Sequence, residues 1–142
     1  MVVRLEFTST FEMLDFVQVV SDHIGQTVGL DDDTQHYVGV AIRECVINAI
    51  KHGNRHDASK HVFVEFSTRD AAGDGAAVEL TILVRDQGEG FDPAAVADPL
   101  APENLLKTSG RGILIIRSFM DDVQLCSAPE GGMEIRMVKR LP

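Results

Sequence analysis

Two pairs of apolar segments, each joined by a short glycine-bearing connection, constrain the fold of this chain most. Strands are predicted over His61–Arg69 and Ala77–Asp86, and again over Asp121–Ala128 and Met133–Arg140. Short connections that contain glycine are typical of antiparallel hairpins. A further strand is expected over Val2–Thr8, where apolar and polar residues alternate. The chain is therefore predicted to build a mixed, mainly antiparallel sheet.

The first predicted helix follows the opening strand. Ser9 and Glu12 form a capping-box pattern, in which Ser9 would cap the helix and Glu12 would reach back to its backbone. Gly25 is expected to end this helix, because glycine is common just beyond a last helical turn.

The second predicted helix begins at Asp31–Asp33, whose negative charges favour a helix N-terminus. It is expected to run to about His52, with Gly53 as its stop. A short, very apolar helix is predicted over Gly112–Met120. Helices that cover one face of hairpin-joined strands give a two-layer α+β sandwich. A single domain spanning residues 1–142 is expected from the chain length.

The charge of the chain argues against several classes of function. Its formal net charge is −9 at pH 7, and no basic stripe offers itself to a nucleic-acid backbone, so direct nucleic-acid binding is not expected. No segment approaches the roughly 20 apolar residues of a membrane helix, and the N-terminus does not look like a signal peptide. Cys45 and Cys126 both fall in apolar segments and are predicted to be buried, reduced thiols. We expect a cytoplasmic protein without membrane contact.

Three polar residues lie along one side of the second predicted helix. Glu44 and Asn48 are four residues apart, on the flank of its apolar stripe, where side chains can line a cleft. The amide oxygen of Asn48 could ligate Mg²⁺, or Asn48 could simply bond a neighbouring loop. Glu44 could act as a general base in phosphoryl transfer, or could be a solvated carboxylate. His52 lies a further turn along this side, where it could contact a bound nucleotide or cap the helix.

A second candidate segment follows the strand that ends near Asp86. An ionised carboxylate only accepts hydrogen bonds, so Asp86 suits an amino group such as that of adenine. Gly88 and Gly90 would let a purine ring lie close to the backbone. The alternatives are a plain turn and a calcium loop, and the latter lacks the alternating oxygen ligands and the distal glutamate.

A third segment precedes the last predicted helix. Free backbone N–H groups, the helix dipole and two cations would favour a triphosphate there. Residues 92–109 carry three prolines and no periodicity, and a loop of this length is usually either a functional lid or disordered. The candidate nucleotide-binding residues of this segment are Lys107, Thr108, Ser109, Gly110, Arg111 and Gly112.

Together these segments resemble the motifs of the GHKL (Bergerat-fold) ATPases, which include gyrase, Hsp90, MutL and sensor histidine kinases. Glu44–Gly53 resembles their N box, Asp86–Gly90 their G1 box and Ser109–Gly112 their G2 box. The stretch Gly110–Val123 is very similar to the G2 region of the small bacterial serine/threonine kinases that act as anti-sigma factors. The short form of that family also matches the 142 residues of this chain.

This resemblance implies a function and partners. It implies ATP and Mg²⁺ as ligands, with Asn48 on the metal, Glu44 as base or polariser and Asp86 on adenine. It further implies phosphates held beneath a lid from residues 92–109. The implied partners are a sigma factor and an anti-anti-sigma (STAS) protein with an acceptor serine or threonine, and a homodimer is expected. A non-catalytic module that binds ATP or ADP and exchanges protein partners is the alternative.

Overall fold

A computed structural model describes residues 1–71, 75–88 and 112–142, and its sheet has the strand order β1-β2-β3-β5-β4. Every neighbouring pair of described strands is antiparallel, where the sequence predicted a mixed, mainly antiparallel sheet. The predicted strands are all present. They are β1 (Val2–Thr8), β2 (His61–Asp70), β3 (Ala77–Arg85), β4 (Asp122–Ser127) and β5 (Met133–Arg140).

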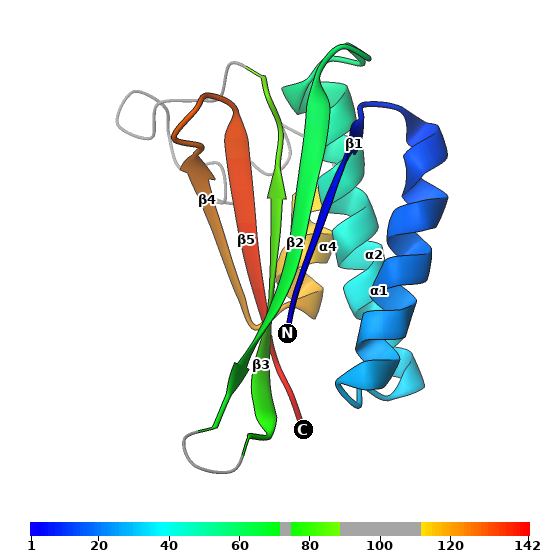
Figure 1. The fold of residues 1–142 in the computed structure, drawn as a ribbon, viewed down its shortest axis with the longest axis vertical. Helices are drawn as coiled ribbons and strands as arrows, with labels where there is room; N and C mark the ends of the chain where they lie inside the picture. The colour runs from blue at the N-terminus through cyan, green and yellow to red at the C-terminus, as the bar shows by residue number, and fades with distance from the viewer. Residues whose placement is uncertain (72–74, 89–111) are drawn as a thin grey trace.

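The helices lie on one face of this sheet (Figure 1), which confirms the predicted two-layer α+β fold. The longest, α2, is followed directly by a π-helical turn, so helical backbone continues to Gly53 as predicted. The helical elements are η1 (Phe11–Met13), α1 (Leu14–Thr27), α2 (Asp32–Asn48), the π-helical turn η2 (Ala49–Gly53) and α4 (Gly112–Phe119). No helix in the described residues is long and apolar enough to cross a membrane.

The core lies between the sheet and the helices because successive strand residues point to opposite faces. Alternate residues of β2 and β3 are buried toward the helices, and they pack against the apolar side of α2. This core includes Val62, Val64, Phe66, Leu80, Ile82, Val84, Ile42, Val46 and Ile50.

Two predicted helix boundaries are wrong. Ser9 does not cap a helix: its hydroxyl donates to the backbone oxygen of Lys60 and accepts from the side chain of Asn54. The residue before η1 is Thr10, which makes no side-chain capping bond. Helix α1 passes through the buried Gly25 and ends at Thr27. Gly29, with φ of +81°, is the glycine that turns the chain toward α2.

The two cysteines differ in exposure. Cys45 is buried as predicted, and its burial raises the pKa of the thiol, with a smaller contribution from the charge of Glu44. Cys126 is exposed, contrary to the prediction. It lies on the edge strand β4 opposite Glu134 of β5, and its thiol lies 3.5 Å from the Glu134 carboxylate. The apolar residues of β4 alternate with Cys126, so they face the core and the cysteine does not.

Candidate functional site

Asp86 lies just beyond the end of β3, with only 2% of its surface exposed. Its Oδ1 accepts the backbone N–H groups of Gly88 at 2.9 Å and Met133 at 3.1 Å. The Asp86 N–H in turn donates to the Met133 oxygen. Within the described part of the chain, Oδ2 accepts no hydrogen bond. Among these residues, hydrogen bonds thus hold the carboxylate in place through one oxygen only.

Glycines from three separate segments make room for this carboxylate. A Cβ at Gly53 would stand 2.0 Å from Asp86 Oδ2, and one at Gly132 would stand 2.2 Å from the Asp86 backbone oxygen. A Cβ at Gly88 would stand 2.1 Å from the Gly53 oxygen. Any other residue at these positions would push the segments apart, because no real side chain tolerates such distances. The end of the helical segment, the loop after β3 and the β4–β5 turn therefore meet at Asp86.

Burial raises the pKa of the Asp86 carboxyl above its usual range. The N–H groups of Gly88 and Met133 oppose this rise, as does the positive charge of Lys60. A buried carboxylate with an oxygen lacking a donor is costly in an empty site and gains when a donor binds it. Perturbed carboxyls of this kind often mark functional sites.

Asn48 is the last residue of α2 and is 8% exposed. Its side-chain amide has no hydrogen-bond partner among the residues that the structure describes. The alternative of an asparagine that bonds a neighbouring loop therefore finds no partner in the described residues, and residues 89–111 lie outside them. Glu44 is partly buried one turn earlier on the same side of the helix, and His52 is exposed within η2. A buried amide without a partner costs about 1–3 kcal/mol, so a ligand at Asn48 would relieve that cost.

A buried asparagine that sequence reasoning did not single out completes the site. Asn54 is 1% exposed, and its amide bonds reach three other segments of the chain. Its Oδ1 accepts the Gln87 N–H at 2.7 Å, and its Nδ2 donates to Ser9 Oγ and to the His61 oxygen. One indication of this role was present in the sequence, which is that Asn54 directly follows Gly53 at the end of the predicted helix.

The remaining predicted site residues lie mostly outside the described residues. This holds for Gly90, for the predicted lid at 92–109 and for the residues from Lys107 to Arg111. Gly112 is the first residue of α4, as the sequence predicted. The assignment of residues 107–112 to phosphate binding stays a prediction. The described residues hold no group of three or more His, Cys, Asp or Glu side chains able to bind a metal.

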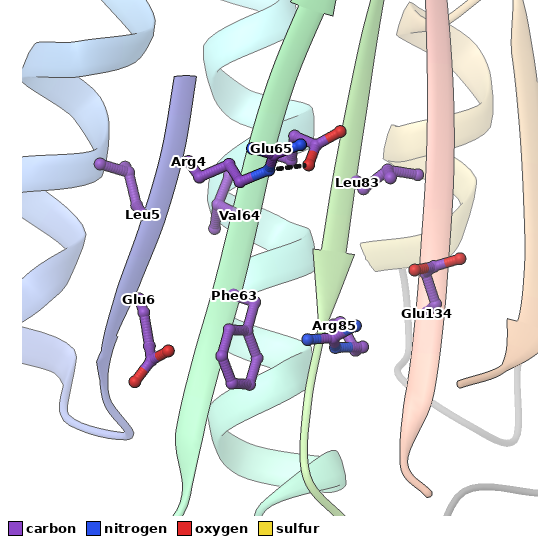
Figure 2. A pocket seen from close by; sticks show the side chains of 9 residues that line it. All are labelled: Arg4, Leu5, Glu6, Phe63, Val64, Glu65, Leu83, Arg85 and Glu134. Atoms are coloured by element: carbon purple, nitrogen blue, oxygen red, sulfur yellow. Dashed lines mark hydrogen bonds and ion pairs between the residues drawn. The ribbon is translucent and has the colours of Figure 1, made fainter. Parts of the chain in front are cut away.

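A separate hollow of about 300 Å³ lies on the sheet face that the helices leave open (Figure 2). Arg4 bonds Glu65 there at 2.7 Å, and the Arg85 guanidinium lies 4.4 Å from the centre of the Phe63 ring. The lining residues include none of the predicted site residues. Arg4 and Glu65 are paired with each other across neighbouring strands, and the hollow is separate from the site around Asp86.

Comparison with known proteins identifies the family of this chain. Residues 7–139 match the family of histidine kinase-like ATPase domains. The chain belongs to that family, which confirms the predicted GHKL resemblance. Among its relatives, the anti-sigma F factor of Oceanobacillus iheyensis is 34% identical over 142 residues, which cover 96% of this chain and 90% of that protein. The anti-sigma F factor of Bacillus subtilis is 33% identical over 97% of this chain and 91% of its own length.

Solved structures share the fold at lower sequence identity. The RsbU and RsbW domains of a Mycobacterium tuberculosis protein match with a TM-score of 0.67 and 18% identity, over 99% of this chain and 32% of that one. A mycobacterial sensor histidine kinase, MprB, matches with a TM-score of 0.58 and 16% identity, over 98% of both chains. The SiaB–SiaC complex of Pseudomonas aeruginosa supplies a match with a TM-score of 0.60 and 14% identity, over 98% of this chain and 89% of that one.

Proposed function

We propose that this chain is an ATP-dependent protein serine/threonine kinase that acts as an anti-sigma factor. The anti-sigma F factor relatives, which align over nearly the whole chain, support the anti-sigma role. Membership of the histidine kinase-like ATPase family supports the use of a nucleotide. The observation that carries the proposal is the Asp86 carboxylate, buried among three glycines with Oδ2 left without a described donor.

In this proposal Asp86 selects adenine. Its free oxygen accepts a hydrogen bond from the exocyclic amino group, which guanine does not present at the corresponding position. Gly88 lets the loop after Asp86 pack closely against the Gly53 backbone. Gly88 and Gly90 are proposed to shape the pocket for the ring. Because Oδ1 is already fixed by two backbone N–H groups, the carboxylate is held in its binding orientation before the nucleotide arrives.

Asn48 fits the role of a magnesium ligand. Mg²⁺ takes oxygen ligands and often only one or two from the protein, and Asn48 offers a buried amide oxygen with no described partner. When bound, the ion supplies neutralisation of phosphate charge during transfer. The predicted residues Lys107, Thr108, Ser109, Gly110 and Arg111, with Gly112 at the start of α4, would hold the phosphates.

Glu44 is proposed to act on the acceptor hydroxyl. Its carboxylate would take the proton from the serine or threonine oxygen as that oxygen attacks the terminal phosphate. Its position one turn before Asn48, on the same side of α2, supports a place beside the metal-bound phosphate. His52 extends this row toward the nucleotide, and its exposure leaves it free to contact a ligand.

The names of the anti-sigma F factor relatives support a sigma factor as a partner. We propose a sigma factor, which the chain sequesters, and a STAS-type antagonist that it phosphorylates. From the resemblance to the small anti-sigma kinases we further propose that the chain forms a homodimer. Analytical ultracentrifugation of the purified protein would test that last point directly.

Transfer of radiolabelled phosphate from ATP to a purified STAS protein tests the kinase proposal. Glu44→Gln should keep Mg·ATP binding but lower transfer by roughly 10²- to 10⁴-fold, the range for losing a general base. Asn48→Ala should lose Mg²⁺-dependent binding as well as transfer.

Asp33→Asn serves as the control, because it makes the same carboxylate-to-amide change at the exposed opposite end of α2. It should leave transfer unchanged. Full transfer by Glu44→Gln would remove Glu44 from the mechanism. ATP binding by the wild type without transfer to any STAS protein would favour a non-catalytic switch.

A further inference from the structure

We infer that Asn54 is a positioning residue that fixes the base-binding loop, residues 86–88, through the backbone of Gln87. This inference rests on the proposed role of Asp86 in binding adenine. Asn54 is not expected to touch the nucleotide. It acts through the peptide that follows Asp86.

The bonds of Asn54 use both donors of its amide group and its oxygen. Oδ1 accepts the Gln87 N–H at 2.7 Å, while Nδ2 donates to Ser9 Oγ at 2.6 Å and to the His61 oxygen at 2.9 Å. With 1% of its surface exposed, Asn54 cannot exchange these bonds for water. Its amide plane is thus held at three points, which fixes the direction of the oxygen toward Gln87.

The base-binding loop is supported from two sides. On one side, the Asp86 N–H donates to the Met133 oxygen of β5, and the Met133 N–H donates to the Asp86 carboxylate. On the other side, Asn54 holds the Gln87 N–H, and the Gln87 side chain accepts the His61 N–H at 2.7 Å. Without the Asn54 bond, the peptide after Asp86 would lose its fixed position on the helical side. The Asp86 carboxylate bonds Gly88 within this loop, so its orientation depends on that peptide.

Asn54 also links the base-binding loop to the helix that carries Asn48. The Asn54 N–H donates to the Ala49 oxygen at 2.7 Å and closes the π-helical turn η2. Gly53, inside that turn, is packed against the Asp86 carboxylate. The dipeptide Gly53-Asn54 thus contacts both Asp86 and Gln87. The turn η2 therefore connects Asn48, the proposed metal ligand, with Asp86, the proposed base ligand.

A positioning role and a merely structural role make different predictions. If Asn54 only stabilises the fold, its loss lowers the unfolding midpoint but leaves the preference among bound nucleotides unchanged. If it positions Asp86, its loss selectively weakens the bond to the adenine amino group. Purine riboside triphosphate, which lacks that amino group, is therefore the comparison ligand for ATP.

The experiment measures Kd for both triphosphates with Mg²⁺ by calorimetry, below the unfolding midpoint of each variant. The wild type should prefer ATP by about ten- to a hundredfold, the worth of one hydrogen bond to a charged acceptor. Asn54→Leu, nearly isosteric but unable to bond Gln87, should reduce this preference to within about threefold. Asn54→Asp keeps an oxygen for the Gln87 N–H and should retain the preference despite a lower unfolding midpoint.

Ser9→Ala is the matched control, because it removes a partner of the Asn54 amide but leaves the bond to Gln87. It should lower stability and keep the nucleotide preference. An unchanged preference in folded Asn54→Leu would overturn the inference. Should Asn54→Leu not fold, hydrogen exchange of the wild-type Gln87 amide decides: protection supports the bond, and rapid exchange overturns it.

Asp86→Asn separates failure of this inference from failure of the proposed function. If Asp86→Asn keeps the full preference for ATP, the proposed base contact itself is wrong. If Asp86→Asn loses the preference while Asn54→Leu keeps it, only the role of Asn54 is wrong. If the base contact and the role of Asn54 are both right, the double variant should have the same ratio of Kd values for the two triphosphates as Asp86→Asn alone.

Discussion

The two ends of α2 are closed in different ways. At its N-terminus, the exposed Asp31 accepts the Thr34 N–H at 2.7 Å, and Gly29 turns the preceding chain in an open region with no nearby atoms. These features lie within a few residues of one another. At the C-terminal end, the π-helical turn leads into Asn54, which bonds segments 45 and 33 residues away in the sequence.

The N-terminal end of α2 therefore has a structural role, whereas its C-terminal end also serves the candidate site. Local bonds can close a helix end, but they bring no distant group to it. The long-range contacts of Gly53 and Asn54 bring Asp86, from the end of β3, beside the helix that carries Glu44 and Asn48. The C-terminal end of α2, which depends on these tertiary contacts, is therefore the end that carries the candidate nucleotide site. Changes at the two ends should have unequal effects on nucleotide binding.

Gly53→Ala should give the largest effect. Its Cβ would stand 2.0 Å from Asp86 Oδ2 and 2.3 Å from Cγ, so the carboxylate must move. Displacing a binding group by about 1 Å can lower activity roughly 10²-fold. We expect phosphoryl transfer to fall by at least that factor, together with weaker ATP binding by calorimetry.

Gly29→Ala is the counterpart at the other end, where φ is +81° and no atom lies within 4 Å of the added Cβ. It should lower the unfolding midpoint through backbone strain and leave ATP affinity intact. Equal loss of ATP affinity in the two alanine variants would break the comparison between the helix ends.

Asp86→Asn should weaken ATP binding by about ten- to a hundredfold, because a hydrogen bond to a charged acceptor is lost. The preference for ATP over GTP should fall in the same variant. Calorimetric titration with each nucleotide measures both effects. Unchanged ATP affinity would show that the carboxylate does not face the base.

Ionisation of Asp86 should also make the free energy of unfolding depend on pH, and this effect should be smaller than the loss of ATP binding. Burial raises its folded-state pKa above the usual 3.8, so the native state holds the proton at pH values where the unfolded chain has released it. The free energy of unfolding therefore falls as pH rises from about 3.8 through the raised pKa, and then levels off. Urea denaturation across this range should show wild type losing stability relative to Asp86→Asn. If the difference in unfolding free energy between wild type and Asp86→Asn did not change with pH, the raised pKa would be contradicted.

Asp31→Ala should have the smallest effect on function. The Thr34 N–H loses its capping acceptor, and the lowered pKa of Asp31, caused mainly by that N–H, shows that the bond favours the ionised form. The thermal midpoint should fall slightly, with unchanged ATP affinity and transfer. A large loss of nucleotide binding here would mean that both ends of α2 serve the site.

Much of the fold could be predicted from the sequence because it depends on short-range patterns. Alternation in β2 placed Val62, Val64 and Phe66 on one face, and the short glycine-bearing connections specified hairpins. The spacing of Glu44 and Asn48 put them on one side of a helix, since four residues make about one turn. These features need only the geometry of a helix or a strand, which neighbouring residues determine.

Only the tertiary structure decided where Ser9, Asn54 and Gly132 act. Ser9 and Glu12 have the spacing of a capping box, but the Ser9 hydroxyl instead meets Lys60 and Asn54, brought to it by the pairing of β1 with β2. Gly132 looks like an ordinary turn residue until the pairing of β3 with β5 sets it against Asp86. Local patterns carry no record of such contacts, because they form between segments that only the folded chain brings together.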